Sequence, residues 1–126
     1  MSFDWNEYFL LAKELSGDSN SLSNEEAKKR SAISRAYYST IIQARAKICS
    51  LTGERYHRRN THAWTIGQYR SHPTPLAKSI AARLGRLKKR RERADYDDHI
   101  SSLNAELSSA LMEAEKLIED INKLHN

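Results

Sequence analysis

The strongest constraint on the fold of this chain is a spacing of apolar residues typical of helices, in a sequence with few residues that break them. Only four glycines and two prolines occur in 126 residues, so the helices are expected to be long. No segment alternates apolar and polar residues as a half-buried strand does. The sequence therefore predicts an all-α fold.

Capping and turn residues divide the chain into four main helices and one short helix, the third. The fifth predicted helix has the most regular apolar stripe, from Ile100 to Leu124. The predicted starts are Asp4, Ser23 or Asn24, Thr61, Thr74-Pro75, and Asp97 or Asp98, and the predicted ends include the turn at 16–21, Gly53 and Pro73. We expect a single domain, residues 1–126, folded as an antiparallel helical bundle.

The composition argues against several kinds of protein. Cys49 is the only cysteine, which argues against a disulfide framework and a cysteine zinc cluster. The acidic amino-terminal segment lacks the basic region of a signal peptide, and no apolar run approaches the ~18 residues of a membrane span. We therefore expect a cytoplasmic protein with no membrane segment and no cofactor.

Positive charge is concentrated in the body of the chain. The net charge is +5, although residues 94–126 contain eight acids and only two bases. Between residues 83 and 93 the basic residues are Arg83, Arg86, Lys88, Lys89, Arg90, Arg91 and Arg93, with Glu92 as the one acid. A basic body of this kind favours partners that carry phosphates.

One arginine of this basic run follows the apolar stripe of the fourth predicted helix. The stripe is formed by Leu76, Ile80, Leu84 and Leu87, at spacings of four, four and three residues. Four more residues lead to Arg91, whereas Arg93 lies roughly 200° further around the helix. We therefore predict that Arg91 points along the seam of the bundle and that Arg93 faces elsewhere. Lys89 and Arg90 are expected to be solvated.

An acidic break and a histidine follow the basic run. Asp95, Asp97 and Asp98 precede His99, which we place in the first turn of the fifth helix. A histidine beside arginines suits metal-independent RNA cleavage, in which a base takes the 2′-OH proton and cations stabilise the phosphorane. The simpler alternative is an exposed residue next to a helix cap. No second histidine lies at zinc-ligand spacing, which argues against zinc. Loosely held magnesium is the alternative, but capping accounts for Asp97 or Asp98 more simply, so we expect no metal site.

The loop at residues 54–60 is a candidate RNA-binding segment. It places Tyr56 among Arg55, Arg58 and Arg59, a mixture that suits unpaired bases and RNA phosphates. The alternative is an ordinary solvated loop.

Tyr37 and Tyr38 are expected in the core rather than at a stacking surface, and a buried tyrosine hydroxyl needs a partner. Asp95 and Arg35 are candidates for such a polar cluster, because a charge near the core of a bundle must be paired.

Two stretches of the sequence form a recognisable pair. They are residues 31–38, SAISRAYY, on the second predicted helix, and residues 91–97, RERADYD, after the fourth. Together with the number, order and length of the helices, they resemble HEPN domain proteins of the small single-domain prokaryotic branch. The resemblance implies a homodimer in which two Arg-to-His motifs meet in one cleft. It also implies metal-independent endoribonuclease activity, commonly of toxins or phage-defence effectors, and often a small nucleotidyltransferase antitoxin as partner.

The family motif, an arginine with a polar follower and then a histidine after four to six residues, fits in two registers. Arg93 is separated from His99 by five residues, but Ala94 takes the polar position. Arg91 has the polar Glu92 after it and follows the inward stripe, but Tyr96 then takes the place of the histidine. The resemblance makes Arg91, Arg93, Tyr96 and His99 the candidate catalytic residues, with Tyr96 as an orienting hydroxyl.

Two functions therefore follow as hypotheses. The first is a homodimeric endoribonuclease that needs no metal. The second is a non-catalytic HEPN dimer that binds or regulates a partner such as a small nucleotidyltransferase. DNA binding is less favoured, because no helix-turn-helix pattern with a tight glycine turn is present.

Overall fold

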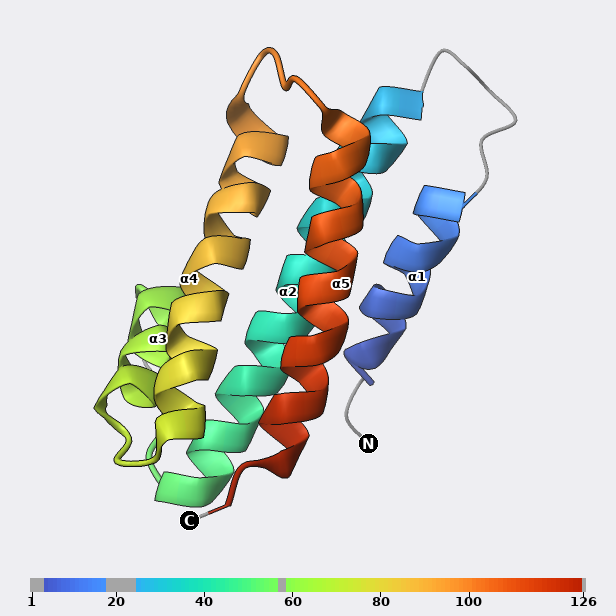
Figure 1. Cartoon of the computed structure of the whole chain (residues 1–126). Coiled ribbons are helices and arrows are strands. Elements are labelled where there is room, and N and C mark those ends of the chain that lie inside the picture. The colour runs from blue at the N-terminus through green and yellow to red at the C-terminus, as the bar shows by residue number, and fades with distance from the viewer. Residues whose placement is uncertain (1–3, 18–24, 57–58, 126) are drawn as a thin grey trace.

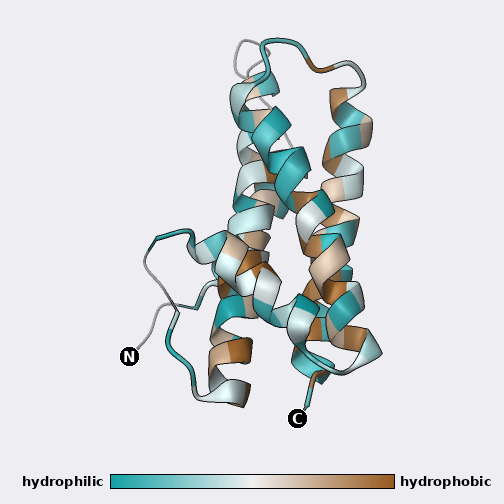
Figure 2. Ribbon diagram, turned by 90° about the vertical axis from the view of Figure 1, so that its left-hand side faces the viewer, coloured by the Kyte–Doolittle hydropathy of each residue, from teal (hydrophilic) through white to brown (hydrophobic). Residues whose placement is uncertain are grey.

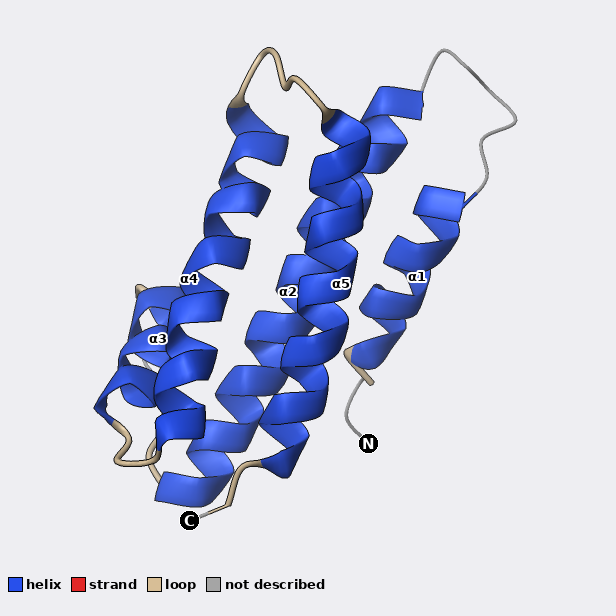
Figure 3. Cartoon of the chain, viewed as in Figure 1, coloured by secondary structure: helices blue, strands red, loops and turns tan. Residues whose placement is uncertain are grey.

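The computed structural model describes residues 4–17, 25–56 and 59–125. Within these ranges the chain forms five α-helices and no strand (Figure 3). The helices are α1 (Asn6–Gly17), α2 (Glu25–Thr52), α3 (Thr61–Ser71), α4 (Pro75–Tyr96) and α5 (Leu103–Lys123). The prediction of an all-α fold is confirmed for the described residues.

Local capping explains where two of the helices begin. Asp4 Oδ1 accepts a hydrogen bond from the Asn6 N–H at 3.0 Å, at the start of α1. Thr74 caps α4, because its hydroxyl accepts from the Ala77 N–H at 3.2 Å and Pro75 occupies the first turn. Both starts agree with the sequence prediction. The predicted caps of α2, Ser23 and Asn24, lie outside the described residues.

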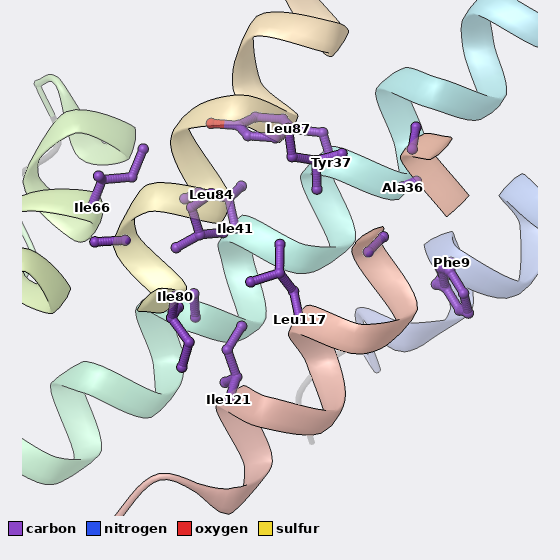
Figure 4. Packing of buried hydrophobic residues seen from close by; sticks show 14 of the residues in the cluster. Phe9, Ala36, Tyr37, Ile41, Ile66, Ile80, Leu84, Leu87, Leu117 and Ile121 are labelled. Carbon is purple, nitrogen blue, oxygen red and sulfur yellow. The ribbon is translucent and has the colours of Figure 1, made fainter. Parts of the chain in front are cut away.

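The three longest helices, α2, α4 and α5, lie lengthwise against one another, with α1 against α2 on one side and α3 against α4 on the other (Figure 1). Ile41, Leu84 and Leu117 come from α2, α4 and α5 and point into one core (Figure 4). Hydrophobic residues gather where the helices face one another, and the connections are mostly hydrophilic (Figure 2). Burial of this shared core is the main force that holds the bundle together.

Two polar contacts fix the helices at defined positions. Arg83 of α4 donates to Asp120 Oδ2 of α5 at 2.6 Å, and both side chains are mostly buried. The Tyr69 hydroxyl of α3 donates to the Ala44 carbonyl of α2 at 2.7 Å. Each contact satisfies a buried polar group that would otherwise destabilise the fold.

None of the described helices combines the length and the apolar composition that a bilayer crossing requires.

Candidate functional site

A buried arginine of α4, Arg91, lies against two tyrosines of α2. The residue is 9% exposed, and its guanidinium carbon lies 5.1 Å from the ring centroid of Tyr37 and 5.5 Å from that of Tyr38. A spacing of four residues from Leu87 continues the buried stripe of α4 to this position. The predicted inward orientation of Arg91 is confirmed. The aromatic faces partly replace the water that the guanidinium gives up on burial.

Asp95 balances the charge of this buried arginine. Arg91 Nη1 lies 3.5 Å from Asp95 Oδ2, and the Ser34 hydroxyl donates to the same oxygen at 3.5 Å. Arg35, the other candidate for a polar cluster with the tyrosines, points elsewhere. Its Nε donates to Ser31 Oγ at 3.0 Å, and its guanidinium carbon lies 5.9 Å from the ring centroid of a tyrosine of α1.

His62, in the first turn of α3, is a member of this cluster that the sequence did not indicate. Tyr37 Oη and His62 Nδ1 are hydrogen bonded at 2.9 Å. Burial raises the pKa of the Tyr37 phenol, and Arg91 only partly opposes that effect. Burial also lowers the pKa of His62, and the cations Arg91, Lys88 and Arg45 lower it further. We call Tyr37, Tyr38, His62, Arg91 and Asp95 the arginine cluster.

The lowered pKa of His62 predicts a loss of stability on acidification. The folded protein favours the neutral imidazole, so the unfolded chain binds a proton first as the pH falls below the ordinary histidine value of 6.5. The stability that follows from the lowered pKa of His62 is fully present above pH 6.5 and is lost progressively as the pH falls below that value. Urea denaturation at a series of pH values will measure the effect. His62→Gln should lose less stability than the parent protein between neutral pH and pH ~5.

The control for this prediction is His125→Gln, because His125 is exposed near the end of α5. Its pH dependence should match that of the parent protein. Identical pH dependence in the parent and in His62→Gln would contradict the assignment.

The end of α4 is held by an arginine near the start of α2. Arg30 of α2 donates to the carbonyl oxygens of Ala94 at 3.0 Å, Asp97 at 2.6 Å and Asp98 at 3.3 Å. The last carbonyls of a helix have no partner within it, and a guanidinium is well suited to satisfy several of them. Arg30 therefore fixes the direction of the chain as it leaves α4.

This contact accounts for a wrong prediction about the start of α5. The sequence placed the cap at Asp97 or Asp98 and His99 in the first turn. In the structure α5 begins at Leu103, and Asp97 is instead the C-cap residue of α4. Arg30 binds the carbonyls of Asp97 and Asp98, in the stretch where the first turn of α5 was predicted. Ser102 then precedes α5 with a left-handed φ of 61°.

His99 therefore lies in the connection between α4 and α5, where it is exposed. It lines a surface depression of about 240 Å³ together with Arg93, Asp97 and Glu106, among others. Arg93 of α4 is partly exposed and its Nη2 lies 3.2 Å from Glu106 Oε1. The structure thus brings Arg93 and His99 to one depression, and it keeps Arg91 in the separate, buried arginine cluster.

Glu106, in the first turn of α5, also pairs with Arg90. The prediction that Arg90 is simply solvated is therefore wrong, whereas Lys89 is exposed as expected. Sequence reasoning did not select Glu106 or Arg30. Opposite charge on the next helix is the signal that points to Glu106. Nothing local points to Arg30, because its partners are backbone carbonyls more than sixty residues away.

The remaining predicted site residues are spread over the surface. Tyr96 is 74% exposed at the last position of α4. Arg55 and Arg59 are exposed on either side of residues 57 and 58, and Arg58 lies outside the described residues. Within the described ranges, no three or more side chains of His, Cys, Asp or Glu gather as a metal site would require.

No family model matches this chain, and the searches of curated proteins and of solved structures gave no match either.

Proposed function

We propose that this chain is a HEPN-type endoribonuclease with an antiparallel bundle fold, which acts as a homodimer and needs no metal. The observation that carries the proposal is the shared depression of Arg93 and His99, two residues separated by the spacing of the family motif. The Arg93 side chain is 44% exposed and His99 is exposed, so both can reach an RNA phosphate. Arg91 suits this role less well, because its guanidinium is buried against tyrosines.

The proposed reaction breaks one bond of the RNA backbone. A histidine removes the proton of a 2′-OH, and the oxygen attacks the neighbouring phosphorus. The bond from phosphorus to the 5′ oxygen breaks, an acid protonates that oxygen, and a 2′,3′-cyclic phosphate remains. Arg93 stabilises the negative charge that the phosphorane gains. Tyr96, exposed one turn from Arg93, supplies the orienting hydroxyl.

A homodimer is part of the proposal because the reaction needs two proton-transfer groups. One imidazole cannot accept the 2′-OH proton and protonate the leaving oxygen in the same step. A second copy of the chain supplies a second His99, which provides the missing group. Glu106 holds Arg93 before RNA arrives, and the phosphate then competes with this carboxylate. Arg55 and Arg59 are exposed and contribute contacts to RNA phosphates.

The test is cleavage of a labelled RNA by the purified protein in the presence and absence of EDTA. The expected result is equal cleavage in both, with products that end in a 2′,3′-cyclic phosphate. A 2′-O-methyl substitution throughout the RNA should abolish cleavage, because the attacking hydroxyl is blocked. Cleavage that requires Mg²⁺, or that leaves 5′-phosphate ends, would overturn the proposed mechanism.

A second candidate function is a non-catalytic HEPN dimer that binds a protein partner, such as a small nucleotidyltransferase encoded beside it. The observation that favours it is charge compensation: Arg90, Arg91 and Arg93 each pair with a carboxylate of the same chain. Expression of the chain alone distinguishes the two functions. Growth arrest with RNA loss favours a toxin or defence nuclease, and normal growth with intact RNA favours the non-catalytic dimer.

A further inference from the structure

The flank of α4 that faces α2 and α3 carries positive charge that has no carboxylate partner in the described part of the chain. Arg90 and Arg93 face α5, where both pair with Glu106. Lys88 lies on the other flank, because it precedes Arg90 by two residues and is therefore roughly 200° from it around the helix. Neither Arg45 nor Lys88 forms an ion pair with a described carboxylate. A cation without an ion pair is available to an external anion, and Glu92, four residues after Lys88, is the acid on this flank of α4.

An exposed aromatic ring adjoins this charge. The guanidinium carbon of Arg45 lies 4.1 Å from the ring centroid of Tyr56, in the segment that follows α2. Tyr56 is 44% exposed, so the arginine holds the ring in place without covering it. A ring fixed at low conformational freedom is well suited to stack an unpaired base, and an adjacent guanidinium strengthens such stacking.

A surface depression of about 430 Å³ lies beside this ring. It is lined by Cys49, Glu54, Arg55 and Tyr56. The carboxylate of Glu54 repels a phosphate but accepts a hydrogen bond from the amino group of a base. Because Glu54 and Arg55 carry opposite charges, the depression suits a neutral base, and the cations Arg45 and Lys88 suit the phosphate next to it.

We propose that Arg45, Tyr56 and Lys88 form a binding surface for single-stranded RNA, separate from the depression of Arg93 and His99, in which Tyr56 stacks a base and the two cations hold phosphates. We call it the Tyr56 surface. The choice of RNA as the ligand rests on the proposed function. The Tyr56 surface deepens that function, because it gives the RNA strand a second contact on the opposite flank of α4. Binding here requires neither Arg93 nor His99.

The test is fluorescence anisotropy with a labelled, unstructured 2′-O-methyl oligonucleotide, which the proposed reaction cannot cleave. Tyr56→Leu removes the ring and keeps apolar bulk, and the loss of one stacked base should weaken binding by about 5- to 100-fold. Tyr56→Phe keeps the ring and should bind within about twofold of the parent protein. Arg45→Lys keeps the charge without the planar group and should give an intermediate loss.

The salt dependence of binding tests the cations separately. Lys88→Gln should reduce the slope of log Kd against log salt concentration by about 0.7, the value for one phosphate contact on a single strand. Lys13→Gln removes the same charge from α1, across α2 from this surface, and should leave the slope unchanged. Circular dichroism of each variant establishes that the helices are retained.

Two results would overturn the inference. In the first, Tyr56→Leu and Lys88→Gln both bind the oligonucleotide with unchanged affinity. In the second, Tyr56→Phe binds it as weakly as Tyr56→Leu. If heparin displaces the oligonucleotide equally well from the parent protein and from Tyr56→Leu, the surface binds RNA by charge alone and does not stack a base. The proposed function fails in a different way, because cleavage of unmodified RNA is measured independently. If the protein cleaves RNA but Tyr56→Leu binds the oligonucleotide like the parent protein, only the binding surface is rejected. If Tyr56→Leu weakens binding but the parent protein does not cleave RNA, only the nuclease is rejected.

Discussion

Replacement of His99 by alanine is expected to reduce RNA cleavage by about 10²- to 10⁴-fold, the usual contribution of a general acid or base. The imidazole is exposed in the connection between α4 and α5, so its removal should change the free energy of unfolding by no more than about 0.5 kcal/mol. Initial rates on a labelled RNA, together with urea denaturation of the same preparations, will measure both quantities. His125→Ala, another exposed histidine, is the matched control and should retain full activity.

A mixing experiment tests whether the two proton transfers use one histidine from each copy of the chain. When the parent protein and His99→Ala are mixed in equal amounts and allowed to exchange subunits, about one quarter of the dimers carry two histidines. At the same total protein concentration, activity should therefore be about one quarter of that of the unmixed parent protein. A value of about one half is expected if each copy of the chain acts with its own histidine alone. Full activity of His99→Ala by itself would remove this residue from the mechanism.

Local spacing was sufficient to predict the orientation of Arg91. Helical geometry relates this residue to the buried Leu84 and Leu87 of the same helix, so the seam of the bundle could be extended to it without knowledge of the partner helices. The start of α4 was predictable for the same reason, since Thr74 and Pro75 act within one turn. Features that depend on a few neighbouring residues are within reach of the sequence.

The start of α5 was not predictable in this way. Aspartate is a strong cap residue, and Asp97 and Asp98 precede a regular apolar stripe. In the structure Arg30 binds the carbonyls at the end of α4, and Asp97 ends that helix instead of starting the next one. Tertiary contact therefore overrode local preference. The consequence for the site is direct, because it places His99 in the connection beside Arg93 and not on a helix.

His62 was missed for a related reason. Its position after Thr61 resembles any first turn of a short helix, and the sequence does not show that the turn packs against Tyr37. The arginine cluster unites residues of α2, α3 and α4, and only the packing of three helices brings them together. The SAISRAYY and RERADYD stretches each contribute members of this cluster, which gives both stretches a structural role independent of any catalysis.

Replacement of Arg91 by alanine is expected to lower the free energy of unfolding by about 2–4 kcal/mol, because it removes a buried side chain and leaves the partner groups unpaired. The guanidinium contacts the rings of Tyr37 and Tyr38 and lies 3.5 Å from Asp95. Arg91→Lys keeps the charge and the aliphatic stem, and it loses only the planar contact with the rings. It should therefore destabilise the protein by about half as much. Urea denaturation monitored by circular dichroism will measure each change.

The matched variant is Arg93→Ala, two residues along the same helix. Its side chain is 44% exposed and pairs with Glu106 at the surface, so its loss should lower the free energy of unfolding by less than about 1 kcal/mol. The same substitution should reduce cleavage, because Arg93 faces the depression of His99. Stability and activity should thus separate between the two arginines. The reverse pattern, in which Arg91→Ala is stable but inactive and Arg93→Ala is active, would transfer the phosphate-binding role to Arg91. The arginine cluster would then have to open when RNA binds.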